Sequence, residues 1–184
     1  MWCQTFKHMK RTLCCIVAIL TTVAVFAQNE EKARWSPEFS IKAFAGVYHG
    51  SYDFTAGARI NDNVFGLGSG YATMHMDAYP ADVRKIPVYA FYRRYSPLGQ
   101  KRRFLLFGEV TLGGECIYKY TGNTTGRFAE SHQTPPYWQW RVSFTPGIAL
   151  RLFGNTSIYI APTLEVFGLQ DLHGGITAGV NVGL

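Results

Sequence analysis

Cysteine is scarce in this sequence and unevenly distributed. Three of the four cysteines lie before residue 27, and only Cys116 follows. The part of the chain after residue 27 therefore has no second thiol with which to form an internal disulfide. We expect Cys116 to act as a small apolar side chain on a strand and not as a reactive thiol.

Long hydrophobic runs are equally scarce. The one continuous apolar run spans residues 13–25, which is shorter than the roughly 20 residues of a transmembrane helix. It follows the basic residues Lys7, Lys10 and Arg11, and its last residue begins the small-x-small sequence Val25-Phe26-Ala27. This order is typical of a secretory signal peptide, so we expect residues 1–27 to be removed during export. An uncleaved membrane anchor is the alternative.

Neither a large charge excess nor a metal-binding pattern is present. Lys7, Lys10 and Arg11 supply three of the six net positive charges, so the remaining excess is weak support for nucleic-acid binding. Beyond residue 27, no two histidines have a spacing such as H-x-x-x-H, and Cys116 has no cysteine partner. We expect no metal, no cofactor and no nucleic-acid partner.

What the sequence does contain is a regular alternation of apolar and polar residues. In residues 138–153 every second position from Trp138 to Leu152 is apolar, whereas the positions between them include Arg141 and Arg151. The alternation returns in residues 157–167 and 175–184. A period of two predicts strands with one apolar face. Because these segments are about ten residues long and their apolar faces carry no charge, we interpret them as strands that cross a bilayer.

Five further segments extend this pattern to eight predicted strands. Short links follow Ile60, Tyr95 and Phe153, and longer polar links follow Met76 and Tyr120. This alternation is typical of an all-β, antiparallel up-and-down transmembrane β-barrel, and an even strand number places both termini in the periplasm. Residues 28–37 are then a short periplasmic segment and residues 38–184 the barrel, although residues 39–76 could hold two strands instead of three. The predicted strands are residues 39–49, 52–60, 64–76, 84–95, 104–120, 138–153, 157–167 and 175–184.

Four stretches carry a resemblance to a known class of proteins. They are TAGARI at 55–60, VFGLGSGY at 64–71, IPVYAFYRRY at 86–95 and FGEVTLG at 107–113. With them, the whole chain after residue 27 resembles the small bacterial outer-membrane β-barrel proteins of the OmpA/OmpX and PorT-like type. The resemblance implies an outer-membrane location, contact with outer-membrane lipids and insertion by the barrel-assembly machinery. It says almost nothing about activity, a ligand or a surface partner.

The polar faces of the predicted strands define the candidate site. An eight-stranded barrel has an interior only wide enough for its own side chains, so charges on that face have to pair with one another. We therefore predict a packed lumen charge network, with close carboxylate–arginine contacts among Glu109, Glu115, Arg141, Arg151 and Glu165; a proton or ion path is the alternative. The full predicted network is Lys42, Asp53, Arg59, Glu109, Glu115, Arg141, Arg151 and Glu165.

Other patterns point less clearly to chemistry. The run Gly66-x-Gly68-x-Gly70 is not followed by a helix, so it is no nucleotide loop; it predicts a bend or room for a bulky inner side chain. His49 with Ser51, or His132 with Ser131, could form part of a serine-hydrolase site near a rim, but no complete set of nucleophile, base and orienting group can be placed there.

The function that the sequence favours is therefore a non-enzymatic outer-membrane barrel with a role in envelope structure or surface interaction. The alternative is a barrel hydrolase or acyltransferase that modifies outer-membrane lipids. A soluble periplasmic binder of the lipocalin type would need polar residues on its outer wall, and the predicted outer faces lack them.

Overall fold

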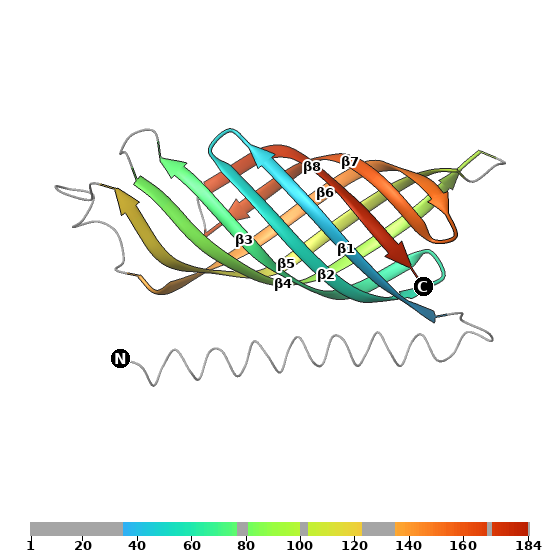
Figure 1. The fold of residues 1–184 in the computed structure, drawn as a ribbon, viewed down its shortest axis with the longest axis horizontal. Coiled ribbons are helices and arrows are strands. Elements are labelled where there is room, and N and C mark those ends of the chain that lie inside the picture. The colour runs from blue at the N-terminus through green and yellow to red at the C-terminus, as the bar shows by residue number, and fades with distance from the viewer. Residues whose placement is uncertain (1–34, 77–80, 100–102, 123–134, 169–170, 184) are drawn as a thin grey trace. The chain divides into compact units, whose positions relative to one another are not determined.

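The computed structural model describes residues 35–76, 81–99, 103–122, 135–168 and 171–183, and in these residues it contains eight β-strands. The predicted signal peptide, and most of the segment predicted at residues 28–37, lie outside them. Figure 1 shows the strands wound into a tilted barrel. The strands are β1 (Trp35–Gly46), β2 (His49–Ile60), β3 (Asn63–Met76), β4 (Ala81–Leu98), β5 (Phe104–Gly122), β6 (Tyr137–Phe153), β7 (Thr156–Phe167) and β8 (Asp171–Gly183).

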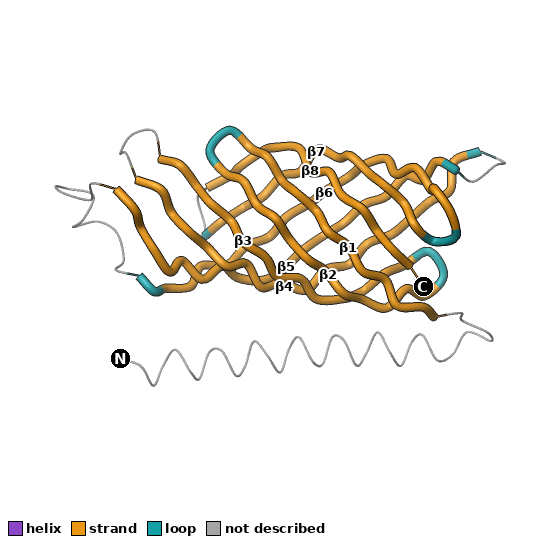
Figure 2. The backbone as a smooth tube through the Cα atoms, viewed as in Figure 1, coloured by secondary structure: helices purple, strands orange, loops and turns teal. Residues whose placement is uncertain are grey.

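All eight strands belong to one closed antiparallel barrel. Each strand pairs with the next in the sequence, and β1 closes the barrel by pairing with β8, with Phe39 opposite Val182 and Ala43 opposite Ala178. Strand follows strand around the tube in Figure 2 without a crossover. The predicted eight-stranded up-and-down fold is therefore confirmed, including three strands between residues 39 and 76.

The two rims of the barrel differ in their connections. We call the rim at which β1, β3, β5 and β7 begin and β2, β4, β6 and β8 end the turn end. The other ends of the eight strands lie at the opposite rim, the loop end. At the turn end, Asn61 and Gly154 have φ angles of 56° and 53°. Asparagine and glycine tolerate this left-handed conformation, which tight hairpin turns require.

Several strand boundaries differ from the prediction. The first strand starts at Trp35 and ends at Gly46, so its first residues fall within the range expected to be periplasmic. His49 opens β2 opposite Met74, and the chain turns at Val47 and Tyr48. The alternation continues through Val47, which made the turn invisible in the pattern. Pairing with neighbours similarly lengthens β4 and starts β8 earlier than the sequence suggested.

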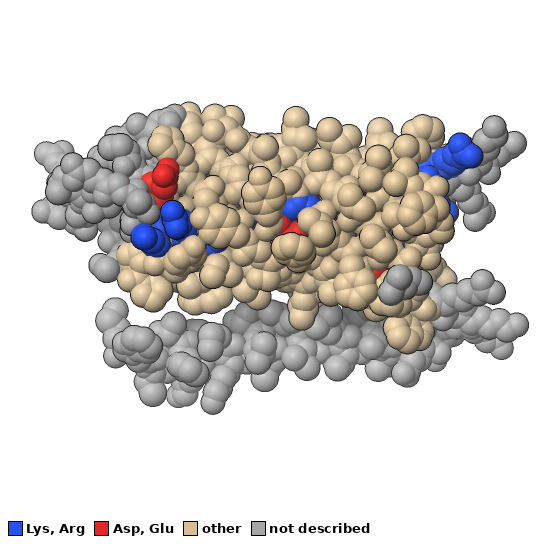
Figure 3. All heavy atoms as spheres, viewed as in Figure 1, with Lys and Arg blue, Asp and Glu red and all other residues tan. Residues whose placement is uncertain are grey.

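The outer wall is apolar over most of its height. Large hydrophobic side chains on every strand are exposed there, among them Phe54 (62%), Leu112 (55%), Ile160 (62%) and Ile176 (58%). In Figure 3, Lys, Arg, Asp and Glu gather mainly toward the two ends of the wall, apart from a small charged patch near the middle of the view. This distribution is the reverse of that in a water-soluble protein, because the ionised side chains lie inside.

In the part of the chain that the structure describes, no helix is long and apolar enough to span a membrane.

Candidate functional site

Charged side chains fill much of the barrel interior. Among the described residues, ten Lys, Arg, Asp and Glu side chains are buried on the inner face, and their charges cancel. Burying an unpaired charge costs several kcal/mol, so a balanced set of this size is stable only if its members contact one another. The cations are Lys42, Arg59, Lys85, Arg93 and Arg141, and the carboxylates are Glu38, Asp53, Glu109, Glu115 and Glu165.

The half of the interior nearer the turn end is organised around Arg93, which is completely buried. Its Nε donates to Glu109 Oε2 at 2.8 Å, its Nη2 makes a second, short contact with the same oxygen, and its Nη1 donates to Glu38 Oε1 at 2.9 Å. Lys42 Nζ lies 2.6 Å from Glu109 Oε1, and Arg59 Nη1 lies 3.3 Å from Glu38 Oε2. These five residues form the turn-end network.

Neutral groups complete the hydrogen bonding of this network. Tyr95 donates its hydroxyl to Glu38 at 3.0 Å, and Arg93 Nη1 donates to the side-chain oxygen of Asn181 at 2.7 Å. Arg93 thus reaches strands β1, β5 and β8 from its own strand β4. Because charge-assisted hydrogen bonds are stronger than neutral ones, this residue ties together distant parts of the wall.

A second group of charges, the loop-end network, surrounds Arg141. Arg141 makes a short contact with Glu165 through Nη2, and its Nη1 lies 3.6 Å from Glu115 Oε1. Asp53 Oδ2 lies 3.9 Å from the same guanidinium, and Lys85 Nζ lies 3.1 Å from Glu115 Oε2. Every carboxylate of this half therefore faces at least one cation.

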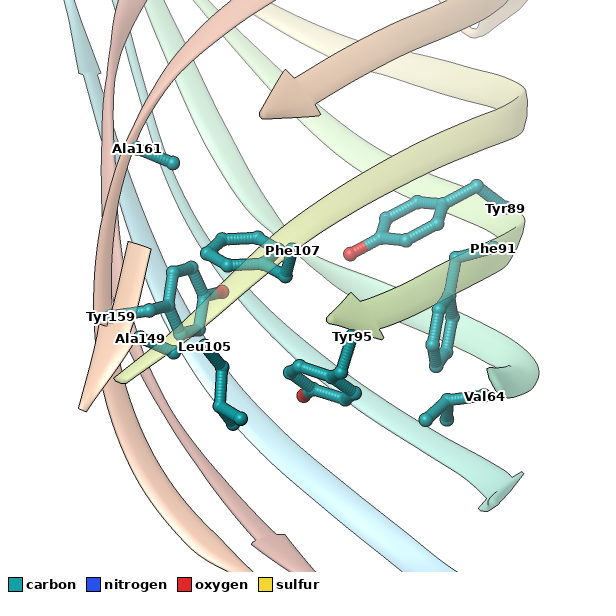
Figure 4. Close-up of a cluster of buried hydrophobic side chains, with 9 residues drawn as sticks. All are labelled: Val64, Tyr89, Phe91, Tyr95, Leu105, Phe107, Ala149, Tyr159 and Ala161. Carbon is teal, nitrogen blue, oxygen red and sulfur yellow. The ribbon is translucent and has the colours of Figure 1, made fainter. Parts of the chain in front are cut away.

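Aromatic side chains fill the space around the two networks. Phe107 and Tyr159 meet edge to face at 4.8 Å between ring centroids, and Tyr95 lies 6.3 Å from Phe107. Figure 4 shows these rings, with Tyr89 and Phe91, in one buried cluster inside the barrel. Tyr89 also connects the two networks, because its hydroxyl donates to Asp53 at 3.0 Å and Lys42 Nζ lies 4.9 Å from its ring centroid. The interior is thus packed with side chains.

Glycines on β3 make room for the rings of Tyr89 and Phe91 on the neighbouring strand β4. A Cβ atom on Gly68 would lie 2.4 Å from the ring of Tyr89, and one on Gly66 would lie 2.7 Å from the ring of Phe91. The interpretation of the Gly66-x-Gly68-x-Gly70 run as space for bulky inner side chains is confirmed. The third glycine, Gly70, lies against the backbone and carboxylate of Asp53.

The structure places seven of the eight sequence-predicted lumen residues in these two networks. It brings Glu115 and Glu165 to Arg141, as expected, but Glu109 contacts Arg93 and Lys42 instead of a predicted arginine. Arg151 is the eighth residue, and no ion pair joins it to either network among the described residues. It is half-buried near the turn end, where water can solvate it, and no carboxylate among the described residues lies within 4.0 Å of its guanidinium.

Three charged members of the networks were missed. Glu38 precedes the first predicted strand, which begins at residue 39, so no facing was assigned to it. Lys85 and Arg93 belong to a segment in which both faces carry aromatic residues and Arg93 is followed directly by Arg94. The sequence signal that could have resolved this segment is the series Lys85, Tyr89, Arg93, whose members are four residues apart and therefore share one face of a strand. In the structure all three are buried, whereas Arg94 is exposed.

A histidine lies next to the loop-end network. His49 Nδ1 is 3.2 Å from Glu165 Oε2, and the imidazole packs between the rings of Phe44 and Phe167, each with its centroid 5.3 Å away. Ser51 lies two residues further along β2, so both side chains point inward. The structure thus brings a serine, a histidine and a carboxylate to the same part of the lumen, but Ser51 Oγ and both His49 ring nitrogens have no hydrogen-bond partner, so no nucleophile–base contact is formed.

The burial of these three side chains also distinguishes them from a working hydrolase site, which a substrate must be able to reach. The exposed fractions of His49, Ser51 and Glu165 are 3%, 2% and 1%. A lipid ester would have to enter the packed interior to reach the serine hydroxyl, and Glu165 is already held by Arg141. The other pair considered, Ser131 and His132, lies outside the described residues. Among the described residues no group of three or more His, Cys, Asp and Glu side chains could hold a metal ion.

No protein-family model matches this sequence, and no curated protein shows significant similarity to it. Solved structures do match. The N-terminal β-barrel domain of Pseudomonas aeruginosa OprF is 13% identical, with a TM-score of 0.55, and the match covers 83% of this chain and 100% of that domain. Outer membrane protein H (OprH) of P. aeruginosa is 12% identical, with a TM-score of 0.59 and coverage of 81% and 99%.

The outer membrane enzyme PagL also matches, at 9% identity and a TM-score of 0.49, over 79% of this chain and 98% of PagL. At such low identities the likeness concerns the fold. The chain therefore has the fold of small outer-membrane β-barrels, and its function has to be argued from its own residues.

Proposed function

We propose that this chain is an integral protein of the bacterial outer membrane, with both termini in the periplasm, and that it acts as a closed, non-enzymatic barrel in envelope structure or surface interaction. One observation carries the proposal: the barrel is apolar outside and ionised inside. In water such an arrangement would expose a large hydrophobic surface, whereas in a bilayer the hydrocarbon covers that surface.

The height of the apolar wall supports the membrane location. On β5 the outward residues are apolar or small from Phe104 to Cys116. This segment extends about 40 Å at about 3.3 Å per residue, and a strand tilt of about 40° reduces its height to about 30 Å. That height equals the thickness of the hydrocarbon core of a typical bilayer, about 30 Å.

The packed interior supports a barrel that does not conduct. The turn-end network and the aromatic cluster are interleaved in the lumen, since Arg93 lies over the rings of Phe91 and Tyr159, and the cations and carboxylates contact one another instead of lining a channel. We expect no steady open pore of porin size in planar-bilayer recordings. A stable conductance of that size would contradict the closed barrel.

Fractionation tests the location directly. The protein, expressed with its own N-terminal segment in a Gram-negative host, should appear in the outer-membrane fraction and should migrate faster on gels unheated than boiled. Accessibility of a tag at each terminus to periplasmic and external protease would test the orientation. Recovery in the soluble periplasmic fraction would contradict the proposal.

A lipid-modifying hydrolase is the second candidate, and the contact between His49 and Glu165 with Ser51 on the same face is the observation that favours it. Mass spectrometry of outer-membrane lipids from cells that express wild-type protein or the Ser51→Ala variant separates the candidates. A lipid change that depends on Ser51 would support the hydrolase. Identical lipid profiles support the non-enzymatic barrel.

A further inference from the structure

The outer wall contains two hollows at different heights, a groove that extends from β8 across β1 and β2 to β3 and β4, and a hollow lined by the β1–β2 turn, β2, β3 and β4. The first is an apolar groove of about 580 Å³, in which small residues such as Ala56 and Ser69 lie between larger ones such as Leu67 and Val88. The second, of about 420 Å³, lies beside the turn between β1 and β2. Its lining is more polar and includes Tyr48, Tyr71, Thr73, His75, Asp82 and Arg84.

Residues of β3 and β4 line both hollows, which connects the groove with the polar hollow along these two strands. In the register of β3 and β4, Ser69 is opposite Val88 in the groove, and Thr73 is opposite Arg84 in the polar hollow. The four residues from Ser69 to Thr73 extend about 13 Å toward the loop end. An elongated molecule with an apolar and a polar part could therefore occupy both hollows at once.

Arg84 lines the polar hollow, and a second cation lies opposite it on the next strand. Arg84 is opposite Lys119 of β5, and both side chains are exposed on the outer face. In the described part of the barrel neither has a carboxylate within ion-pair distance, since Asp82 Oδ1 lies 2.8 Å from His75 Nδ1. Like charges opposite each other in a sheet are destabilising, and an anion between them would remove the repulsion.

The height of these cations matches a lipid headgroup. The next outward pair below Arg84 and Lys119 is Ile86 and Cys116, which belongs to the apolar wall. Exposed Tyr71 lies at the same boundary on the neighbouring strand. Aromatic side chains at this position are typical of the membrane–water interface. Figure 3 shows both acidic and basic side chains toward the loop end of this face, beyond the uncharged wall.

We propose that this face binds one phosphate-bearing membrane lipid, whose phosphate contacts Arg84 and Lys119 and whose acyl chain lies in the apolar groove. The proposal rests on the membrane location proposed above. A guanidinium donates paired hydrogen bonds to phosphate oxygens, and the hydroxyl of Thr73 lies in the same hollow to add a donor. A soluble phosphate would satisfy the cations but would leave the groove unused, which favours a lipid.

The test compares two probes that differ only in the phosphate. Purified full-length protein in a neutral maltoside detergent is titrated with dioleoyl phosphatidic acid or with dioleoylglycerol, and native mass spectrometry measures the bound lipid. We expect one phosphatidic acid per barrel and binding of the diacylglycerol weaker by about tenfold or more, because charged hydrogen bonds are lost. Equal binding of the two lipids would overturn the proposal.

Matched variants locate the site. Arg84→Gln with Lys119→Gln should weaken phosphatidic acid binding by about tenfold or more. Arg94→Gln with Arg103→Gln removes two exposed cations from the turn end and should leave binding unchanged. If both double variants bind as wild type does, or if they lose binding equally, the site assignment is overturned.

A third variant separates a lipid site from a phosphate site. Ser69→Phe fills the groove and should lower lipid binding, whereas 10 mM inorganic phosphate should not displace the lipid. Full displacement by phosphate together with wild-type binding by Ser69→Phe would overturn the lipid assignment.

The gel shift and outer-membrane fractionation of the same variants distinguish a failure of the lipid-site proposal from a failure of the proposed membrane location. A correctly inserted barrel without lipid selectivity overturns this inference alone. A protein absent from the membrane overturns the proposed location as well.

Discussion

Replacing Arg93 with methionine tests whether the interior is held together by its charges. Methionine keeps most of the length of the side chain but removes every hydrogen-bond donor of the guanidinium. In the variant, Glu109 retains only Lys42 at 2.6 Å, and Glu38 retains only Arg59 at 3.3 Å and the hydroxyl of Tyr95. Because both carboxylates stay buried, each becomes less well compensated.

The expected loss of unfolding free energy is about 3 kcal/mol. Removing one partner of a buried ion pair costs about 3–5 kcal/mol, and the cations that remain beside Glu38 and Glu109 place this variant at the lower end of that range. Arg94→Met is the matched control, since Arg94 is the next residue but points outward and is exposed. Surface substitutions of this kind usually change stability by less than about 0.5 kcal/mol.

Urea unfolding in detergent micelles, followed by tryptophan fluorescence, measures both variants. A double-mutant cycle then isolates the contact: Glu38→Gln should destabilise less in the Arg93→Met background than in the wild type, because the carboxylate that it removes has already lost its main partner. Equal costs for the two arginine variants, or additive effects in the cycle, would refute the view that buried charge pairing stabilises the interior.

Three further outcomes follow from the same structure. Gly68→Ala should destabilise by about 1–3 kcal/mol, because its Cβ would meet the buried Tyr89 ring, whereas Gly108→Ala, which meets no atom within 4 Å, should be nearly neutral in the same assay. Leu164→Arg on the outer wall should cost about 2–4 kcal/mol if the side chain lies near the bilayer midplane, and a shift in bilayer unfolding free energy below about 0.5 kcal/mol would contradict the assigned facing. Ser51 should not react with a fluorophosphonate probe in the folded barrel, since its side chain is buried; labelling that is lost in Ser51→Ala would support the hydrolase instead.

The fold could be predicted from the sequence because its signal is local and repeated. Each strand from Phe104 onward shows its facing in its own alternation, and a closed barrel is the arrangement that pairs every strand edge within a membrane. Strand boundaries were predicted less well because pairing with a neighbouring strand extends a strand beyond the residues that show the apolar–polar alternation. The turn at Val47 and Tyr48 illustrates this: Val47 continues the apolar alternation of the preceding strand, so the predicted strand extended to His49, which instead begins β2.

The pairing inside the barrel could not be predicted in the same way. Contacts such as that of Lys42 with Glu109 join strands on opposite sides of the barrel, and their partners depend on strand stagger, which no single strand reveals. Arg93 was missed because it lies beside Arg94 in a segment with aromatic residues on both faces. Arg151 was included because its parity is correct, but its height near a rim leaves it hydrated.

The rings and the charged side chains together fill the lumen of the barrel. Tyr89 is the clearest case: Gly68 provides the space for its ring, Asp53 accepts a hydrogen bond from its hydroxyl, and the cations of Lys42 and Arg141 lie within 6 Å of its ring centroid. Charged side chains alone would attract water into the interior, and rings alone could not neutralise the ionised residues that lie there. Together the rings and the ion pairs fill the interior, and most of the buried polar atoms that lack a hydrogen bond gather around Arg141 and His49 in the loop-end half. Any surface activity of this protein must therefore arise at its rims or on its lipid-facing wall, where the two hollows and the pair formed by Arg84 and Lys119 lie.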